Sequence, residues 1–245
     1  HYLNIFQVNE NQLVTLMQTA LGAGGDYADL YFENTTYFNL MLKDGTVSAG
    51  GFHTDYGVGI RVLKGEKTGY AYSENTEMSD MLKAAEAASA IALGADACQA
   101  YSRVTDRKTD CYPDTQNWRQ HEANEFLPFI LNLEKAIFSK DSRIVKVIIR
   151  LSNSVSDVMM FNSLGELTTD SRPMGSITAT AVFEQDGKTE NRSVSRSFRK
   201  GAEMITQELL EEMADEAVKG IDARFEATRP KGGQMSVVMG AGASG

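Results

Sequence analysis

Residues 176–198 read SITATAVFEQDGKTENRSVSRSF, and this stretch decides the class of fold that the sequence predicts. It holds two long strand candidates, Ser176–Gln185 and Thr189–Phe198, on either side of Asp186–Gly187. That dipeptide suits a two-residue turn between antiparallel strands. The stretch therefore predicts an antiparallel hairpin.

Aromatic and apolar runs predict more strands on the N-terminal side of this hairpin. Short turns such as Lys43–Asp44–Gly45 separate several of them, which favours a meander of antiparallel strands. The further strand candidates are Tyr27–Glu33, Tyr37–Leu42, Gly57–Leu63, Thr68–Ser73, Ile144–Leu151, Val158–Asn162 and Leu167–Thr169.

Four segments carry apolar residues at helical spacing. They are residues 10–22, a helix capped by Asn75 or Thr76 and ending near Gly94, residues 124–140, and residues 203–225. Pro128 is expected in the first turn of the third helix, where a missing N–H costs little. Runs of antiparallel strands with segregated helices predict an α+β fold of mostly antiparallel sheets.

The order of these elements divides the chain into four segments. We expect an N-terminal α+β subdomain over 1–95, a polar connecting stretch over 96–123 and a second α+β segment over 124–228. Residues 229–245 are expected to be a linker followed by a closing strand and a glycine-rich turn.

Composition limits the classes of function. The 245 residues are 42% hydrophobic and 23% charged, with a net charge of −9, which argues against the basic surface that nucleic acids require. A local patch of Arg192, Arg196, Arg199 and Lys200 stays open. No apolar run approaches a membrane span. Two cysteines are too few for a disulfide framework, so a reducing cytoplasm is the expected location, although removal of a leader before His1 stays an alternative.

None of the candidate motifs amounts to an active site. His121–Glu122–Ala123–Asn124–Glu125 differs from the H-E-x-x-H zinc motif because Glu125 replaces the second histidine, and a charged helix start explains it better. Gly22, Gly24 and Gly25 follow a helix, the reverse of a dinucleotide fingerprint. Gly240–Gly245 follows a strand candidate but has neither the lysine of a phosphate loop nor a nucleophile elbow.

Three further features have plain structural interpretations. Cys98 and Cys111 are interpreted as ordinary thiols, the acidic positions of residues 203–216 as solvated surface, and Tyr70 and Tyr72 as one face of a strand. The two tyrosines also suit the wall of a peptide groove. No catalytic, cofactor-binding or metal residue is therefore assigned within the 245 residues.

Several segments, taken together and in order, resemble the TldD/PmbA family. ALGAGGDYADLYFE (20–33) is similar to its helix exit and first strand, and DGTVSAGGFHTDYGVGIRVLKGEKTGYAYSEN (44–75) to its next stretch. The alanine-rich MLKAAEAASAIA (81–92) and the closing GGQMSVVMGAGASG (232–245) also match the family pattern, whereas residues 96–200 match it diffusely.

This resemblance implies zinc metallopeptidases that act on unfolded proteins or peptides and form homodimers or heterodimers of paralogous subunits. In the TldD branch the segment similar to 232–245 leads into an H-E-x-x-x-H zinc motif, which this sequence does not contain. The resemblance therefore implies the N-terminal, non-catalytic part of such a peptidase, with zinc bound beyond Gly245. A partner subunit without a zinc motif and a modulator of DNA gyrase are the alternatives.

Overall fold

The computed structural model describes residues 1–93, 105–108, 111–113, 115–228 and 231–240. Within these residues seven strands form one sheet in the order β3-β2-β1-β5-β6-β4, with β7 paired to β6. The strands are β1 (Tyr27–Lys43), β2 (Thr46–Lys64), β3 (Lys67–Ser73), β4 (Thr105–Lys108), β5 (Ile144–Asn162), β6 (Glu166–Gln185) and β7 (Lys188–Phe198).

All described strand pairs are antiparallel except β4 with β6. The hairpin predicted at 176–198 is confirmed, since Gln185 pairs with Lys188 and the turn residues Asp186 and Gly187 have φ of 50° and 76°. Positive φ at both turn positions matches the right-handed twist of the two strands. The predicted α+β class with a mostly antiparallel sheet is confirmed.

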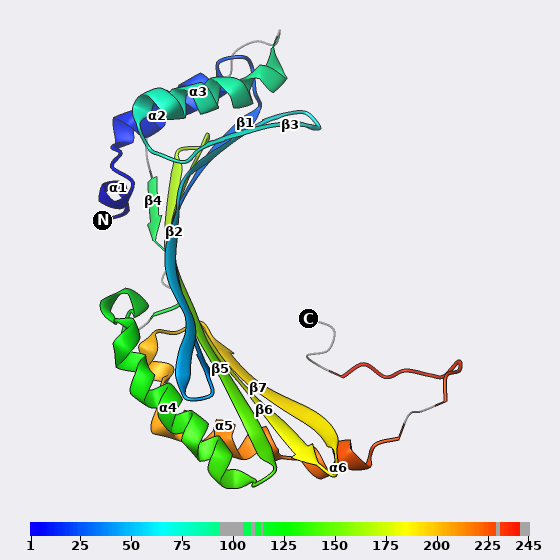
Figure 1. Cartoon of the computed structure of the whole chain (residues 1–245). Helices are drawn as coiled ribbons and strands as arrows, with labels where there is room; N and C mark the ends of the chain where they lie inside the picture. The colour runs from blue at the N-terminus through cyan, green and yellow to red at the C-terminus, as the bar shows by residue number, and fades with distance from the viewer. Residues whose placement is uncertain (94–104, 109–110, 114, 229–230, 241–245) are drawn as a thin grey trace.

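The helices lie on one side of the sheet. Figure 1 shows the sheet curved into a crescent, with α2 and α3 against the convex face of one end and α4 and α5 against that of the other. The described helices are α1 (Tyr2–Ile5), α2 (Glu10–Leu21), α3 (Met78–Ser89), α4 (Ala123–Lys140), α5 (Gln207–Val218) and α6 (Ile221–Glu226), with 3-10 turns at Ala90–Ala92, Trp118–Gln120 and Ala202–Met204.

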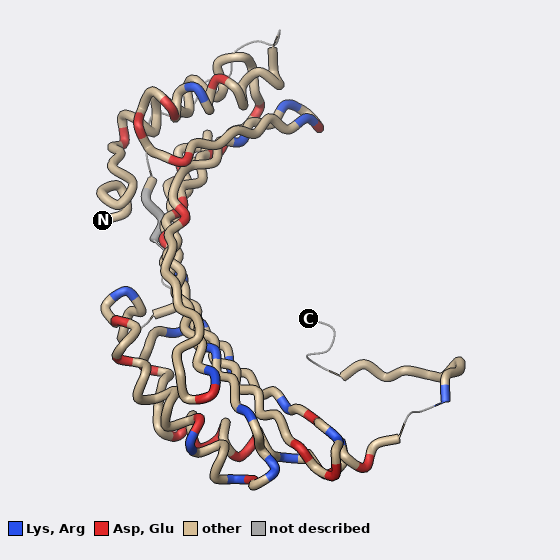
Figure 2. The backbone as a smooth tube through the Cα atoms, viewed as in Figure 1, with Lys and Arg blue, Asp and Glu red and all other residues tan. Residues whose placement is uncertain are grey.

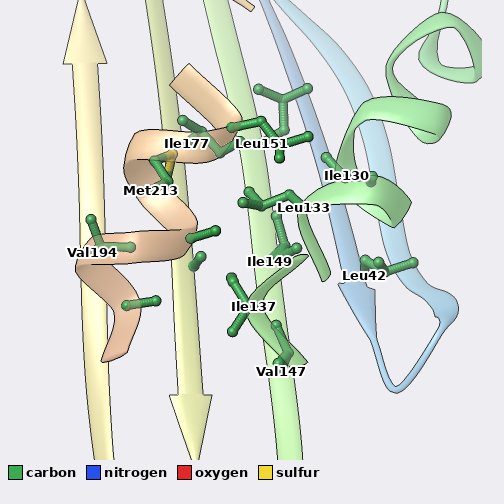
Figure 3. Close-up of a cluster of buried hydrophobic side chains, with 14 of the residues drawn as sticks. Leu42, Ile130, Leu133, Ile137, Val147, Ile149, Leu151, Ile177, Val194 and Met213 are labelled. Carbon is green, nitrogen blue, oxygen red and sulfur yellow. The ribbon is translucent and has the colours of Figure 1, made fainter. Parts of the chain in front are cut away.

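Two hydrophobic cores form beneath these helices. The upper core joins α2 and α3 to one end of the sheet and includes Leu16, Met17, Leu30, Ile60 and Phe161. The lower core joins α4 and α5 to the other end and includes Leu133, Ile137, Ile149, Ile177 and Met213 (Figure 3). Because strand side chains alternate between faces, the convex face is apolar at both ends.

The strands are longer than the sequence indicates. Residues 27–43, 144–162 and 166–185 each form one continuous strand, where the apolar pattern predicts two. The three segments in which the apolar pattern is interrupted lie side by side in the sheet, because Thr35 pairs with Ser156 and Ser156 pairs with Arg172. We call this polar band across β1, β5 and β6, between the two cores, the waist. Its residues lack an apolar pattern because no helix core covers them.

Arg119 holds the strands of the waist together on the convex face of the sheet. Its guanidinium forms an ion pair with Asp157 and donates to the backbone oxygens of Asn34 at 3.1 Å and Val155 at 2.8 Å. It also donates to the hydroxyl of Thr36 at 3.1 Å. One side chain therefore cross-links β1 and β5 at the waist.

Three helix predictions need correction. Pro128 lies in the second turn of α4, since a hydrogen bond from the Glu122 N–H to the Glu125 carboxylate starts the helix at Ala123. The helix expected near Asn75 begins at Met78. The predicted helix 203–225 is divided at Gly220, whose φ of 75° is left-handed. The buried positions predicted for this region are confirmed: Leu210, Met213, Ala217 and Ile221.

The C-terminal predictions are only partly covered by the described residues. Residues 231–240, within the stretch predicted as a linker and closing strand, form no helix or strand, and Val238 is 95% exposed. Predictions on Gly94, Cys98, residues 229–230 and residues 241–245 lie outside the described residues. The division at 95, 123 and 228 stays a prediction, while the strands of both α+β segments pair within one sheet.

Candidate functional site

The concave face of the sheet is the candidate functional surface, since the helices pack on the opposite face (Figure 1). Along β6 and β7 it carries a ladder of paired hydroxyls. Ser176 pairs with Ser197 at 3.0 Å and Thr178 with Ser195 at 3.1 Å, and Thr180 pairs with Ser193 at 2.8 Å. We call these six residues the hydroxyl ladder. Its side chains both donate and accept hydrogen bonds, so this part of the face suits polar contacts.

The upper part of the concave face carries charge and aromatic rings. Arg61 on β2 donates from Nε (2.9 Å) and Nη2 (2.5 Å) to Asp29 on β1, a carboxylate only 5% exposed. The hydrogen bond to Asp29 raises the pKa of Arg61. Burial raises the pKa of the neighbouring Tyr31 phenol, and the charge of Glu33 adds to it. Tyr31 therefore stays a neutral hydrogen-bonding group.

The two edges of the sheet differ. On β7 the backbone oxygens of Asn191 and Ser195 accept hydrogen bonds from Arg224 at 2.8 Å and Arg196 at 3.0 Å. These arginines occupy backbone oxygens with which an added strand would pair. Edge strands are commonly protected in this way against pairing with another chain. On β3 the exposed Tyr70 and Tyr72 flank an edge with no second strand among the described residues. This side of the sheet, which continues along residues 46–57 of β2, is therefore the more open of the two.

The motif around His121 begins a helix, as the sequence analysis predicts. Glu125 accepts from the backbone N–H of Glu122 at 2.8 Å, and its other oxygen lies 2.9 Å from Nδ1 of His121. These two hydrogen bonds lower the pKa of Glu125. His53 stacks on Tyr37 on β1, with ring centroids 4.4 Å apart. Within the described ranges no three histidine, cysteine or acidic side chains form a cluster that could hold a metal ion.

The remaining sequence candidates are dispersed. Gly22 caps the C-terminus of α2, as expected. Cys111 is a free, exposed thiol. The four basic residues weighed as a patch are divided, because Arg196 forms ion pairs with Glu212 and Glu216 whereas Arg199 lies over the ring of Tyr112. Figure 2 shows basic and acidic positions interspersed along this end of the molecule.

The described part of the chain contains no helix with the length and apolar character needed to cross a membrane.

Sequence reasoning found part of this surface. Alternation singled out Tyr70 and Tyr72, which are both 65% exposed. The hydroxyl ladder corresponds to serine or threonine at every second position of 176–180 and 193–197, a pattern that is visible in the sequence alone. The ion pair of Asp29 with Arg61 joins residues 32 positions apart, and its partners became identifiable only from the strand register.

The fold and this surface define a class of α+β proteins in which one curved antiparallel sheet is covered by helices on one face and open on the other. The chain belongs to the PmbA/TldD family. Residues 28–92 match the PmbA/TldA metallopeptidase domain 1, and residues 117–224 match the PmbA/TldA metallopeptidase central domain.

Curated relatives agree with this assignment. The chain is 28% identical over 252 residues to the metalloprotease TldD homolog of Haemophilus influenzae, covering 98% of this chain and 49% of that protein. It is 24% identical over 243 residues to the metalloprotease TldD homolog of Buchnera aphidicola subsp. Schizaphis graminum, covering 96% of this chain and 50% of that protein. The chain thus spans about half the length of the curated relatives it matches.

Solved structures share the fold. A protein of Thermotoga maritima named as a modulator of a DNA gyrase superposes with a TM-score of 0.67 at 20% identity, covering 86% of this chain and 47% of that one. TldE from Thermococcus kodakarensis gives a TM-score of 0.63 at 13% identity, with 86% and 47% covered.

Proposed function

We propose that this chain is the N-terminal, substrate-enclosing region of a TldD-type zinc-dependent metallopeptidase that cleaves unfolded proteins or peptides. One observation carries the proposal: two metallopeptidase-family domains match in order along the chain, while its described residues hold no metal cluster. A chain with this pattern supplies the surface around a catalytic centre and leaves the chemistry to another segment.

The zinc ion that the family implies does not fit the described residues. His1, His53 and His121 lie in α1's N-cap, in β2 and before α4, and none belongs to a group of metal-ligating side chains there. No catalytic step is therefore assigned to this chain. In the proposal the zinc ligands belong to an H-E-x-x-x-H motif beyond Gly245.

The open edge of β3 supports a way to select unfolded substrates. An extended peptide can pair its backbone with a free strand edge irrespective of its side chains, whereas most strands of a folded protein are already paired. Tyr70 and Tyr72 would flank such a peptide. In the proposal a second subunit, identical or paralogous, completes the enclosure around the concave face.

Cleavage by the full-length protein tests the proposal. We expect an unfolded, carboxymethylated substrate to be cleaved, the native form of that substrate to be spared, and a zinc chelator to stop the reaction. Residues 1–245 alone should not cleave it. Cleavage that persists in the presence of the chelator would contradict a zinc peptidase. If the zinc-loaded full-length protein does not cleave the substrate, the alternative of a non-catalytic partner subunit is favoured. Gyrase activity assayed with and without the protein tests the modulator alternative.

Paired proline variants test the edge of β3. The N–H groups of neighbouring strand residues point alternately to β2 and to the open edge, so Ala71→Pro and Tyr72→Pro each remove one of the two kinds. We expect the variant that keeps the wild-type thermal stability to lose peptide cleavage and to retain zinc. Tyr72→Ala, which keeps the backbone N–H, is the control. Unchanged cleavage in a stable proline variant would exclude strand pairing at this edge.

A further inference from the structure

A cavity of about 380 Å³ opens beside β6, within the rough range of 300–1,000 Å³ typical of small-molecule sites. It lies where the pairing of β6 changes partner. The described pairs with β4 end at Thr169, and those with β7 begin at Gly175. The lining residues include Tyr31, Val158, Met160, Asp170, Arg172 and Arg199.

Asp170 gives this cavity an unfilled acceptor. The residue is 8% exposed, and its Oδ2 accepts from Nε of Arg172 at 2.7 Å. Its Oδ1 is the one buried side-chain polar atom in the described residues without a hydrogen-bond partner. Leaving such an atom unsatisfied is costly, so buried polar atoms almost always have a partner. Because Oδ1 is fully buried, a ligand N–H supplies this partner once the Asp170 side chain turns toward the cavity.

Arg199 places a cation at the cavity. Its guanidinium lies over the ring of Tyr112, 5.0 Å from the centroid, and no ion pair to it is present in the described part of the chain. Arg172 already neutralises Asp170, so the charge of Arg199 is in excess. An arginine fork suits a carboxylate. A ligand that is only a cation is disfavoured here.

Val158 and Met160 contribute apolar surface between these polar groups. We propose that the cavity binds the α-carboxylate end of an amino acid or peptide. The carboxylate contacts Arg199, the adjoining N–H donates to Oδ1 of Asp170, and an apolar side chain lies on Val158 and Met160. This inference goes beyond the proposed peptidase function, because binding to this chain without metal tests it separately.

Four probes test separately the contributions of the carboxylate, the N–H group and the rest of the peptide to binding. Calorimetric titration of the metal-free chain would compare the tripeptide Ala-Ala-Leu with free L-leucine, which distinguishes a peptide terminus from an amino acid. The amide Ala-Ala-leucinamide lacks the carboxylate, and 4-methylpentanoate lacks the N–H. We expect the tripeptide or leucine to bind at least ten-fold more tightly than either control, the scale of one charge-assisted hydrogen bond.

Matched variants locate the binding. Arg199→Gln should weaken the better probe at least ten-fold, whereas Arg150→Gln, which removes an exposed arginine on β5 outside the cavity, should not. Asp170→Asn should weaken the probes that carry an N–H relative to 4-methylpentanoate, which has no N–H to lose and gains from the unneutralised charge of Arg172. Should Asp170→Asn fail to fold, Arg199→Gln still decides. No measurable binding, equal binding of acid and amide, or unchanged binding to Arg199→Gln would overturn the proposal.

Discussion

Gly69 of β3 lies so close to Ala88 of α3 that a Cβ on residue 69 would stand 2.1 Å from the carbonyl oxygen of Ala88. A backbone oxygen inside a helix cannot move away without distorting the helix. The contact therefore fixes the distance between α3 and the edge strand that carries Tyr70 and Tyr72, and it links the packing of the upper core to the position of the candidate surface.

We predict that Gly69→Ala destabilises the protein by about 1–3 kcal/mol or more, the usual cost of overpacking. Gly59→Ala is the matched control on β2. Its added Cβ would meet the hydroxyl of Tyr70 at 2.6 Å, but Tyr70 is 65% exposed and its ring can turn away. That change should stay within about 0.5 kcal/mol. Urea unfolding of both variants checks the difference, and equal losses would contradict the proposed contact.

The waist shows how far the sequence could predict the fold. Apolar periodicity located both ends of residues 27–43, 144–162 and 166–185 to within one residue, since helices cover both ends of these strands. It missed the first half of β2, which begins at Thr46 and not at the predicted Gly57, because residues 46–55 are exposed. It failed at Thr35, Ser156 and Arg172, because these paired residues have polar partners in place of a core. Apolar periodicity reflects burial in a hydrophobic core. It therefore gives little signal where hydrogen bonds to Arg119 hold the strands together.

The cavity beside β6 was beyond sequence reasoning for another reason. Tyr112, Asp170 and Arg199 are separated by dozens of residues, and each taken alone resembles an ordinary surface or strand residue. They come together because β6 changes partner between Thr169 and Gly175, a property of register that no local pattern shows.

Asp141 should make stability depend on pH in acid. Its carboxylate accepts from Nε of Arg143 at 3.0 Å and from Nη2 at 2.6 Å, and these hydrogen bonds lower the pKa of Asp141. The folded pKa is therefore below the unfolded one, and the unfolded state binds more protons near pH 4. The stabilisation is present above the unfolded pKa and is lost as the pH falls through the folded pKa.

Asp141→Asn isolates this effect, because the amide oxygen can still accept from the backbone N–H of Arg143, as Oδ1 of Asp141 does at 2.9 Å. We expect the wild type to be more stable than the variant by a constant amount from about pH 5 to 8 and by less below about pH 4. Urea unfolding at a series of pH values measures this. A difference that persists undiminished at the lowest pH would show that the carboxylate charge is not its cause.

The two cores should unfold together, since β1 and β5 run through both of them. Trp118 is the only tryptophan in the sequence and belongs to the lower core, where it is 3% exposed and donates from Nε1 to the backbone oxygen of Lys200 at 2.8 Å. Its fluorescence therefore reports on the lower core alone, whereas far-UV circular dichroism reports on the whole chain.

Leu16→Ala in α2 removes a fully buried side chain from the upper core, and Ile137→Ala does the same in the lower core. Each should cost about 2–5 kcal/mol. If the continuous strands and the bonds of Arg119 couple the cores, Leu16→Ala will shift the Trp118 transition as far as the dichroism transition, although residue 16 belongs to the other core. A Trp118 midpoint that stays at the wild-type value in Leu16→Ala, while Ile137→Ala lowers it, would mean that the waist separates two independently folding ends.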